Sequence, residues 1–367
     1  MLPTPRGVAS RAGNRPEDVS SPASACGVLA AGRSPAARPG RFRGFCWRAA
    51  SLSAAAWLVC TAALAQPAII FELGGKNDRS FGQSAWEGAE RWKKASGRPY
   101  LEFEIANAAQ REQAARRFAE KGANPVVGVG FPQASSIETV AREFPATRFA
   151  IVDMVVNLPN VQSFVYREHE GAFLAGMLAA LASKSGKLGF VGGQDIPLVR
   201  KVLCGYEQGA RHANPKVQLV SAMTGTTNAA WTDPARGAEL ARTQAAQGVD
   251  VIFAAAGTTG LGVLQAAADL HILGIGVDSN QNGLHPGQVL TSMLKRTDVA
   301  VEQAFAGVKP GITVLGLKEG GLDLAYDDNN ARLVTPEMRR KVEAAKADII
   351  AGRIKVIDYT VALACKP

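Results

Sequence analysis

The feature that most constrains the fold is an alternation of short apolar runs with segments of helical periodicity, which begins at Ala68. Near-continuous apolar strands that alternate with helices are typical of parallel sheets covered on both faces. Seven such runs favour two sheets over one. The sequence therefore predicts an α/β protein with two open, mainly parallel lobes. The runs are Ala68–Leu73, Pro125–Phe131, Arg148–Met154, Lys187–Gly192, Val217–Met223, Val249–Ala255 and Ile272–Asp278.

The limits of the two lobes follow from where this pattern breaks and restarts. An extended connection fits residues 157–170, the pattern restarts at Lys187, and Gln288–Lys295 has the character of a strand that crosses back. We therefore expect each lobe to be built from two separate stretches of chain. The expected limits are a leader at 1–65, a first lobe at 66–165 plus about 292–315, and a second lobe at about 166–291 plus 316–362.

The first 65 residues differ in charge from the rest of the chain. They hold eight Arg against Glu17 and Asp18, a local charge of +6, whereas the remaining 302 residues carry only +3 of the total +9. The basic excess therefore does not indicate nucleic-acid binding. Three Arg precede an uncharged stretch, Ala49–Ala65, which ends in Ala-Leu-Ala, the layout of a secretory signal peptide. We expect cleavage near Ala65/Gln66 and a periplasmic protein, with an uncleaved membrane anchor as the alternative.

Removal of the leader leaves Cys204 and Cys365 as the only cysteines of the mature chain. In an exported protein these two residues could form one disulfide bridge. The alternative is a buried thiol on a helix and a free thiol near the C-terminus. No spacing of Cys and His is typical of a metal site, so we expect neither a metal nor a cofactor.

Polar and aromatic side chains recur at the carboxyl ends of the predicted strands, the edge at which open α/β sheets bind ligands. Carboxylates accept hydrogen bonds from hydroxyl and ring N–H groups and repel phosphate, while aromatic rings offer a stacking surface for a base. The pattern favours a neutral ligand that combines a ring with hydroxyl groups. The candidates are the carboxylates Glu72, Asp153 and Asp278, the aromatic residues Phe81, Trp231 and Phe253, and Leu73, Ser80 and Gly257 in the adjoining turns.

The motifs of common enzymes do not occur in this chain. The four His are scattered, and we find no nucleophile elbow, P-loop or dinucleotide fingerprint. We therefore expect a binding protein without catalytic activity. A ligand-sensing module of a regulatory system is one alternative, although it would need a DNA-binding segment, and a nucleoside-processing enzyme is another. Ser80 is also the predicted N-cap of the first helix, because Gln83 completes the spacing of a capping box.

Six motifs stand in order along the chain: GKNDRSFGQSAWEG (Gly75–Gly88), EHEGAFLAGMLAAL (Glu168–Leu181), GFVGGQDIPLV (Gly189–Val199), DVIFAAAGTTGLGV (Asp250–Val263), GVDSNQ (Gly276–Gln281) and SMLKRTDVAV (Ser292–Val301). Together they resemble the basic membrane protein family, solute-binding components of ABC importers that include purine-nucleoside receptors. The resemblance implies the type 1 periplasmic binding protein fold, in which crossing hinge strands join two lobes around a ligand cleft. It also implies a permease and an ATPase as partners.

The resemblance implies roles for individual residues as well. The family usually has Asp where this chain has Glu72, and Asn where it has Gly82. The resemblance implies that both positions lie beside the edge of the bound base. We therefore expect a specificity that differs from that of the purine-nucleoside receptors, with a nucleoside, a nucleobase or another flat heterocycle as the ligand. The residues that match the family's binding positions are Phe81 and Phe253 for the rings that sandwich the base, Asp153, Asp278 and Lys295 for the base edge and ribose, and Gly257 for close approach of the backbone.

Overall fold

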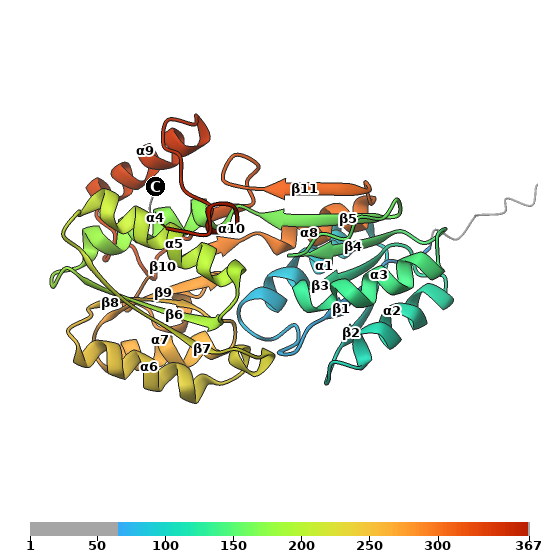
Figure 1. The fold of residues 1–367 in the computed structure, drawn as a ribbon, viewed down its shortest axis with the longest axis horizontal. Helices are drawn as coiled ribbons and strands as arrows, with labels where there is room; N and C mark the ends of the chain where they lie inside the picture. The colour runs from blue at the N-terminus through green and yellow to red at the C-terminus, as the bar shows by residue number, and fades with distance from the viewer. Residues whose placement is uncertain (1–64, 366–367) are drawn as a thin grey trace, which may run out of the picture. The chain divides into compact units, whose positions relative to one another are not determined.

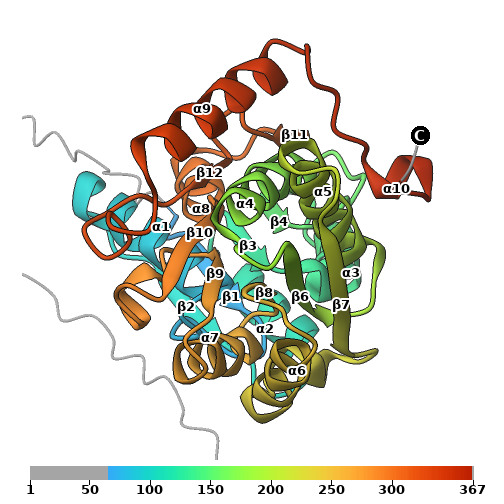
Figure 2. The same ribbon diagram turned by 90° about the vertical axis from the view of Figure 1, so that its left-hand side faces the viewer.

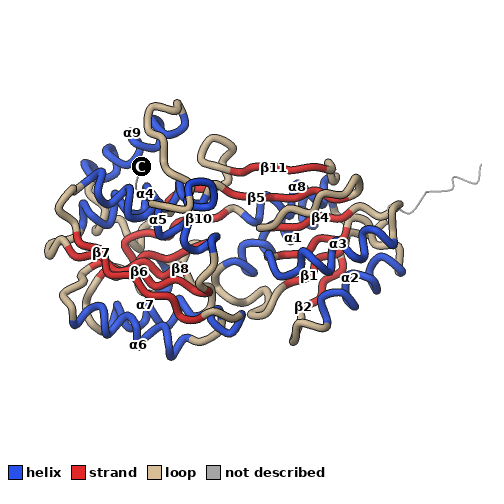
Figure 3. The backbone as a smooth tube through the Cα atoms, viewed as in Figure 1, coloured by secondary structure: helices blue, strands red, loops and turns tan. Residues whose placement is uncertain are grey.

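Twelve strands form two sheets of six strands each in the computed structural model, which describes residues 65–365 (Figure 1). These residues belong to one compact unit of the chain. The strands gather in two separate groups with helices around each (Figure 3). The prediction of two open α/β lobes is therefore confirmed. The predicted signal peptide lies outside the described residues.

The first sheet is parallel throughout, and helices cover both of its faces. Its strands are β1 (Ala68–Phe71), β2 (Leu101–Glu104), β3 (Val126–Val129), β4 (Phe149–Val152), β5 (Val161–Tyr166) and β11 (Gly311–Leu315), in the order β11-β5-β4-β3-β1-β2. Its helices are α1 (Phe81–Ser96), α2 (Gln110–Glu120), α3 (Ala134–Glu143) and α8 (Thr297–Ala306).

The second sheet is parallel except at one edge, where its last strand is antiparallel. Its strands are β6 (Lys187–Gln194), β7 (Gln218–Gly225), β8 (Val251–Ala255), β9 (Leu273–Asp278), β10 (Val289–Lys295) and β12 (Leu322–Leu324), in the order β12-β10-β9-β8-β6-β7. Its helices are α4 (Glu168–Ala182), α5 (Pro197–Ala213), α6 (Pro234–Ala246), α7 (Thr259–Asp269), α9 (Pro336–Ile350) and α10 (Tyr359–Ala362). Figure 2 shows α4 and α5 on one side of this sheet and α6 and α7 on the other.

Alternating side chains of each strand supply the cores on the two faces, as the two-residue period of a strand requires. In β1, Ile69 and Phe71 pack on the side of α1 and α8, whereas Ala68 and Ile70 pack on the side of α2 and α3. In β8, the odd-numbered residues pack beneath α4 and α5, and the even-numbered residues pack against α6 and α7. Burial on both faces explains why these strands are almost wholly apolar.

The chain passes between the two sheets at three places within residues 65–365: from β5 to α4, from β10 to α8 and from β11 to β12. These crossovers are bonded to one another. The Arg167 N–H donates to the Leu315 carbonyl, and the Arg296 N–H donates to the Gly321 carbonyl. The Tyr166 hydroxyl also donates to the Arg296 carbonyl, at 3.0 Å. Neighbouring crossovers of this kind are typical of a hinge between two lobes.

Two details of the predicted organisation were wrong. The chain leaves the second sheet after Lys295 and not near residue 292, because β10 runs its full length beside β9. The predicted connection at 157–170 contains β5 and the start of α4. The strand was hidden in the sequence because two of its buried residues, Gln162 and Ser163, are polar. Among the described residues, no helix has the length and apolar character needed to cross a membrane.

Candidate ligand-binding site

A cavity of about 130 Å³ lies where the carboxyl ends of strands from both sheets converge. This is the edge at which open α/β sheets bind ligands. Eight of the ten residues predicted for the site line this cavity. They are Glu72, Leu73, Phe81, Asp153, Trp231, Gly257, Asp278 and Lys295.

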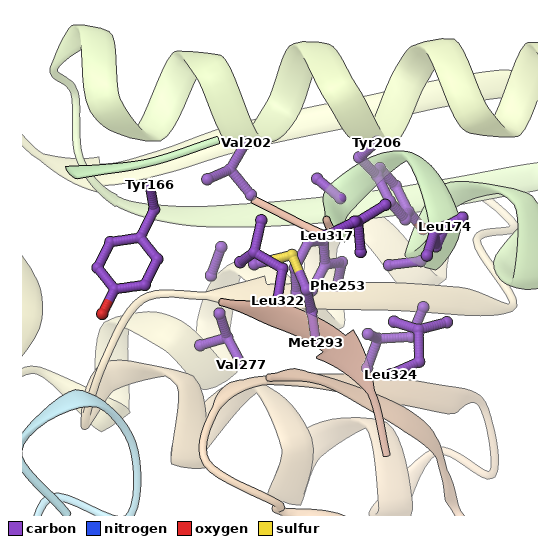
Figure 4. Packing of buried hydrophobic residues seen from close by; sticks show 14 of the residues in the cluster. Tyr166, Leu174, Val202, Tyr206, Phe253, Val277, Met293, Leu317, Leu322 and Leu324 are labelled. Carbon is purple, nitrogen blue, oxygen red and sulfur yellow. The ribbon is translucent and has the colours of Figure 1, made fainter. Parts of the chain in front are cut away.

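Phe253 does not line the cavity, which corrects the predicted pair of sandwiching rings. Its side chain is fully buried and packs between Phe190 and Tyr206, at ring-centroid distances of 5.6 and 5.3 Å. Figure 4 shows Phe253 among Tyr206, Met293 and Leu322 in the core. The reason is position within the strand: Phe253 stands in the middle of β8 on the face covered by α5, two residues before the strand ends.

Trp231 is the aromatic residue that the second lobe presents to the cavity. It ends a short 3-10 turn, Asn228–Trp231, and its indole N–H donates to the side-chain oxygen of Gln194 at 3.4 Å. Two glycines make room for the ring. A Cβ at Gly193 would overlap it, and Gly257 adopts a left-handed φ of 57° beside it. The position of the Trp231 ring is therefore set by its surroundings.

Ser80 does not line the cavity and does not cap α1 with its side chain, so the predicted capping box was wrong. Its hydroxyl donates instead to the Asp278 carboxylate, at 2.6 Å, and thereby links the two lobes. The cap comes from Asp78, which accepts hydrogen bonds from the N–H groups of Ser80, Gly82 and Gln83 at 2.8–2.9 Å. Asp78 also lines the cavity and was missed from the sequence, where an Asp just before a helix is the signal for such a cap.

Asp153 and Asp278 follow β4 and end β9, respectively, and both have a left-handed backbone, with φ of 73° and 66°. Left-handed conformations are uncommon for residues other than glycine, and they concentrate at functional sites. Burial raises the pKa of Asp278 to about 7, although the charge of Lys295 opposes this effect. Burial likewise raises the pKa of Asp153, again against the charge of Lys295.

Lys295 joins the two lobes through a buried network of charges. Its ammonium group lies 2.7 Å from Asp153 of the first lobe and 2.9 Å from Glu168 at the start of α4. Glu168 also pairs with Lys201, which donates to the Tyr166 carbonyl at 2.9 Å. Burial alone would raise the pKa of Glu168, but the charges of Lys295 and Lys201 lower it to about 2. The network holds Glu168 as an anion.

Glu168 and Lys201 were not identified from the sequence as candidates. Glu168 lines the cavity, and Lys201 stands behind it on α5. The available signal was a charged residue at the first position of an otherwise apolar helix, in the motif EHEGAFLAG. A glutamate at a helix N-terminus is already explained by its favourable interaction with the helix dipole. Its place in the cavity wall was therefore not predicted.

Glu72 and Gly82, the two departures from the family pattern, each have a local explanation. The Glu72 carboxylate forms a two-point ion pair with Arg111 of α2, at 2.8 and 2.9 Å, and both side chains are largely buried. Gly82 packs directly on the preceding turn, and a Cβ there would overlap the Gly75 carbonyl. Glu72 therefore faces the cavity as a neutralised pair, and position 82 has no room for a side chain. Residues 65–365 contain no cluster of His, Cys, Asp and Glu that could hold a metal ion.

Comparisons with known proteins agree with this architecture. Residues 66–358 match the family described as "ABC transporter substrate-binding protein PnrA-like". The chain is 31% identical to the ABC transporter nucleoside-binding protein BmpA of Lactococcus lactis subsp. cremoris, over 79% of this chain and 88% of that protein. It is 32% identical to the CD4+ T-cell-stimulating antigen of Listeria monocytogenes, over 79% of this chain and 87% of that protein.

A solved structure of a solute-binding protein has the same fold. The ABC transporter solute-binding protein of Aeropyrum pernix K1 superimposes with a TM-score of 0.72 at 28% identity, over 80% of this chain and 93% of that chain. The predicted family and the predicted type 1 periplasmic binding protein fold are both confirmed. The chain belongs to the PnrA-like family of ABC transporter substrate-binding proteins.

Proposed function

We propose that this protein captures a nucleoside, a nucleobase or a related flat heterocycle in the cavity between its lobes and delivers it to a membrane permease driven by an ATPase. The observation that carries the proposal is the lining of one cavity by aromatic rings and strand-end carboxylates from both lobes. A relative of this chain is named as a nucleoside-binding protein. Delivery to a permease places the site of action outside the cytoplasmic membrane.

Stacking supplies affinity for the ring of the ligand. Phe81 reaches the cavity from the start of α1 and Trp231 reaches it from the second lobe. The two rings are partly exposed, so each has a face available to a ligand. Base–aromatic stacking contributes about 1–3 kcal/mol per base and tolerates different bases. Leu73, Val199 and further apolar residues of the lining exclude water around the rings.

Hydrogen bonding supplies the orientation of the ligand. Asp278 uses one carboxylate oxygen for Ser80 and Asp153 pairs with Lys295, so each carboxylate keeps acceptor capacity for a ligand hydroxyl. Lys295 in turn can donate to a ligand oxygen, since an ammonium group has three donors. Vicinal hydroxyls of a ribose fit this set of acceptors and donors.

The charge of the lining selects against phosphate. Five carboxylates face the cavity, whereas the lining contains one ammonium group, that of Lys295. Two of the five are neutralised by pairing, Glu72 with Arg111 and Glu168 with Lys201. Asp153 in turn pairs with Lys295, so the lining has no cation free to bind a phosphate dianion, and Asp78 and Asp278 repel one where they are ionised. We therefore expect nucleosides or bases to bind and nucleotides to be rejected.

Lobe closure accounts for capture and release. The three crossovers between the lobes provide the hinge, and the Ser80–Asp278 bond is a contact between the lobes that their separation would break. A ligand that touches both Phe81 and Trp231 binds the closed state more strongly and shifts the equilibrium toward it. Release to the permease then follows when the lobes separate.

Calorimetric titration of the exported protein, first freed of bound ligand by unfolding and refolding, tests this function. The panel contains adenosine, guanosine, inosine, cytidine and uridine, their free bases, and the nucleoside 5′-monophosphates. We expect binding of at least one nucleoside or base, and binding of its monophosphate at least about 100-fold more weakly. Absence of binding across the panel, or equal affinity for a nucleoside and its monophosphate, would contradict the proposal.

A further inference from the structure

The C-terminal segment of the described chain is held against α5 by specific contacts. Helix α10 packs on α5. The side chain of Gln208, on α5, forms two hydrogen bonds with the backbone of Ile357: it accepts from the N–H at 2.8 Å and donates to the carbonyl at 3.1 Å. These paired bonds fix the register of the segment along the helix. The register brings residues 364 and 365 to the side chain of Cys204.

Two thiols meet at this contact. Cys204 is fully buried on α5, and its sulfur lies 4.0 Å from the Ala364 carbonyl oxygen. Cys365, which is partly exposed, is the residue after Ala364, and the two thiols are close enough for each to affect the pKa of the other. The side-chain amide of Gln208 lies 3.4 Å from the Cys204 sulfur on its other side. Both thiols are free in this structure.

We propose that Cys204 and Cys365 are oxidised to an intramolecular disulfide once the protein has been exported, and that this bridge fastens the C-terminal segment to α5. The proposal rests on export, which is part of the proposed function, because compartments outside the cytoplasm are where structural disulfides form and persist. The sulfur atoms already neighbour each other on elements of one lobe. Bridging therefore requires only local adjustment of the terminal residues.

The oxidation needs a partner that accepts two electrons, and we assign this role to the disulfide of a thiol oxidoreductase or of glutathione. Cys365 is the first to react because it is the accessible thiol. It loses its proton to solvent, attacks the partner disulfide and releases one partner thiolate. Cys204 then loses its proton and attacks the Cys365 sulfur in the mixed disulfide, which releases the second partner thiolate. Two protein thiols are oxidised and one disulfide is reduced to two thiols.

The environment of the thiols affects the rate of this exchange. Burial raises the pKa of both Cys204 and Cys365, so neither thiol is a reactive thiolate at neutral pH. Spontaneous oxidation by air is accordingly slow.

The bridge has a structural consequence for the ligand-binding cavity. Leu198, Val199 and Val202, from the first half of α5, form part of its wall, and Cys204 is two residues further along. A disulfide at Cys204 links α5, which forms part of the cavity wall, covalently to the C-terminal segment. It also closes a ring of more than 150 residues, and long rings give the largest stabilisation by restricting the unfolded chain.

Peptide mapping of the full chain, expressed with its leader and recovered from the bacterial envelope, tests the proposal. Free thiols are blocked with iodoacetamide before any reduction, and trypsin then yields one cysteine in each of two peptides, Val202–Arg211 and Val356–Pro367. We expect these peptides to be linked to each other without reductant and separate with it. Alkylated, unlinked peptides in the exported protein would overturn the proposal, and so would a Cys365 found linked to another molecule.

Thermal unfolding gives a second readout. We expect reductant to lower the Tm of the wild-type protein by several degrees and to leave the Cys365→Ser variant unchanged. An equal response of both proteins to reductant would contradict the bridge. Ligand titration on the same samples separates the two proposals: ligand binding by a protein without the bridge overturns the disulfide alone, whereas a bridged protein that binds nothing overturns the ligand-capture function alone.

Discussion

Phe81 and Phe253 each belong to a parallel strand or to the segment after one, but only Phe81 lines the cavity, whereas Phe253 is buried in the core. Phe81 follows the end of β1, stands at the first position of α1 and lines the cavity. Phe253 lies within β8 beneath α5 and has no exposed surface. In the second lobe the corresponding place at the cavity belongs to Trp231, on the turn after β7. In a parallel sheet, residues beyond the strand ends are available to a ligand, while the strand interior is used for packing.

The largest expected effect is on stability, where Phe253 should contribute more than Trp231 or Phe81. We expect Phe253→Ala to lower the free energy of unfolding by about 3–5 kcal/mol, because it leaves a cavity in a closed core. Trp231→Ala and Phe81→Ala, at partly exposed rings, should each cost roughly 1 kcal/mol. Urea denaturation of the three variants measures the difference. Equal losses for Phe253 and Trp231 would mean that the contrast between core and cavity is wrong.

The next effect is a pH dependence that arises from Asp278. Its pKa in the folded protein is about 7, above the ordinary value of 3.8, because burial disfavours the charged form. The folded protein therefore retains a proton between pH 4 and 7 that the unfolded chain has released. This contribution to stability is fully present below about pH 4 and is lost as the pH rises through 7, by up to about 4 kcal/mol.

The variant Asp278→Asn isolates this contribution, because an amide cannot lose the proton in question. We expect the unfolding free energy of the wild type, minus that of Asp278→Asn, to fall as the pH rises from 4 to 7. Denaturation at several pH values measures this difference. A difference that stays constant across the range would show that Asp278 is not held in the buried environment described here.

Ligand affinity should depend on Trp231 and Phe81 and not on Phe253, which is the reverse of the order expected for stability. We expect Trp231→Ala and Phe81→Ala each to weaken binding of the ligand identified by calorimetry by about 1–3 kcal/mol, which corresponds to roughly 5- to 150-fold in Kd. Phe253→Leu keeps a large apolar side chain in the core and serves as the matched control, with a Kd within about 3-fold of wild type. A larger loss of affinity in Phe253→Leu than in Trp231→Ala would restore the original pairing of Phe81 with Phe253.

The smallest expected effect comes from the contact between the lobes. Ser80→Ala removes the hydroxyl that donates to Asp278. A hydrogen bond to a charged group contributes about 1.5–3 kcal/mol, so the effect is measured at about pH 8, above the pKa of about 7 at which Asp278 ionises. Part of this energy favours the closed state, so we expect a loss of ligand affinity of roughly 5-fold. The control is Ser96→Ala, at an exposed serine that ends α1, the helix that begins directly after Ser80. An unchanged Kd in Ser80→Ala would show that the bond does not contribute to closure.

The sequence predicted the fold and eight of the residues that line the cavity, because both depend on local patterns. Apolar runs marked strands, and polar residues after those runs marked the binding edge. Asp153 and Asp278 were found in this way, since each closes a run that is itself easy to recognise. The two-lobed arrangement followed from the number of runs.

What the sequence missed depends on distances across the fold. The Ser80 hydroxyl bonds to a carboxylate 198 positions away, so its local capping spacing was misleading. Glu168 and Lys201 are brought to Lys295 by the packing of α4 and α5, which no local spacing records. Phe253 was assigned to the ligand from the family resemblance of its motif, although the predicted strand ended at Ala255 as β8 does; the packing of its ring between Phe190 and Tyr206 is not visible in the sequence.

A crystal structure of the protein with the bound nucleoside or base tests the central claim most directly. We predict that the planar ring of the ligand lies in the cavity and contacts both Phe81 and Trp231, with Asp153 and Asp278 within hydrogen-bond distance of its polar groups. A ligand seated elsewhere, or one that leaves the Trp231 ring without contact, would contradict the claim.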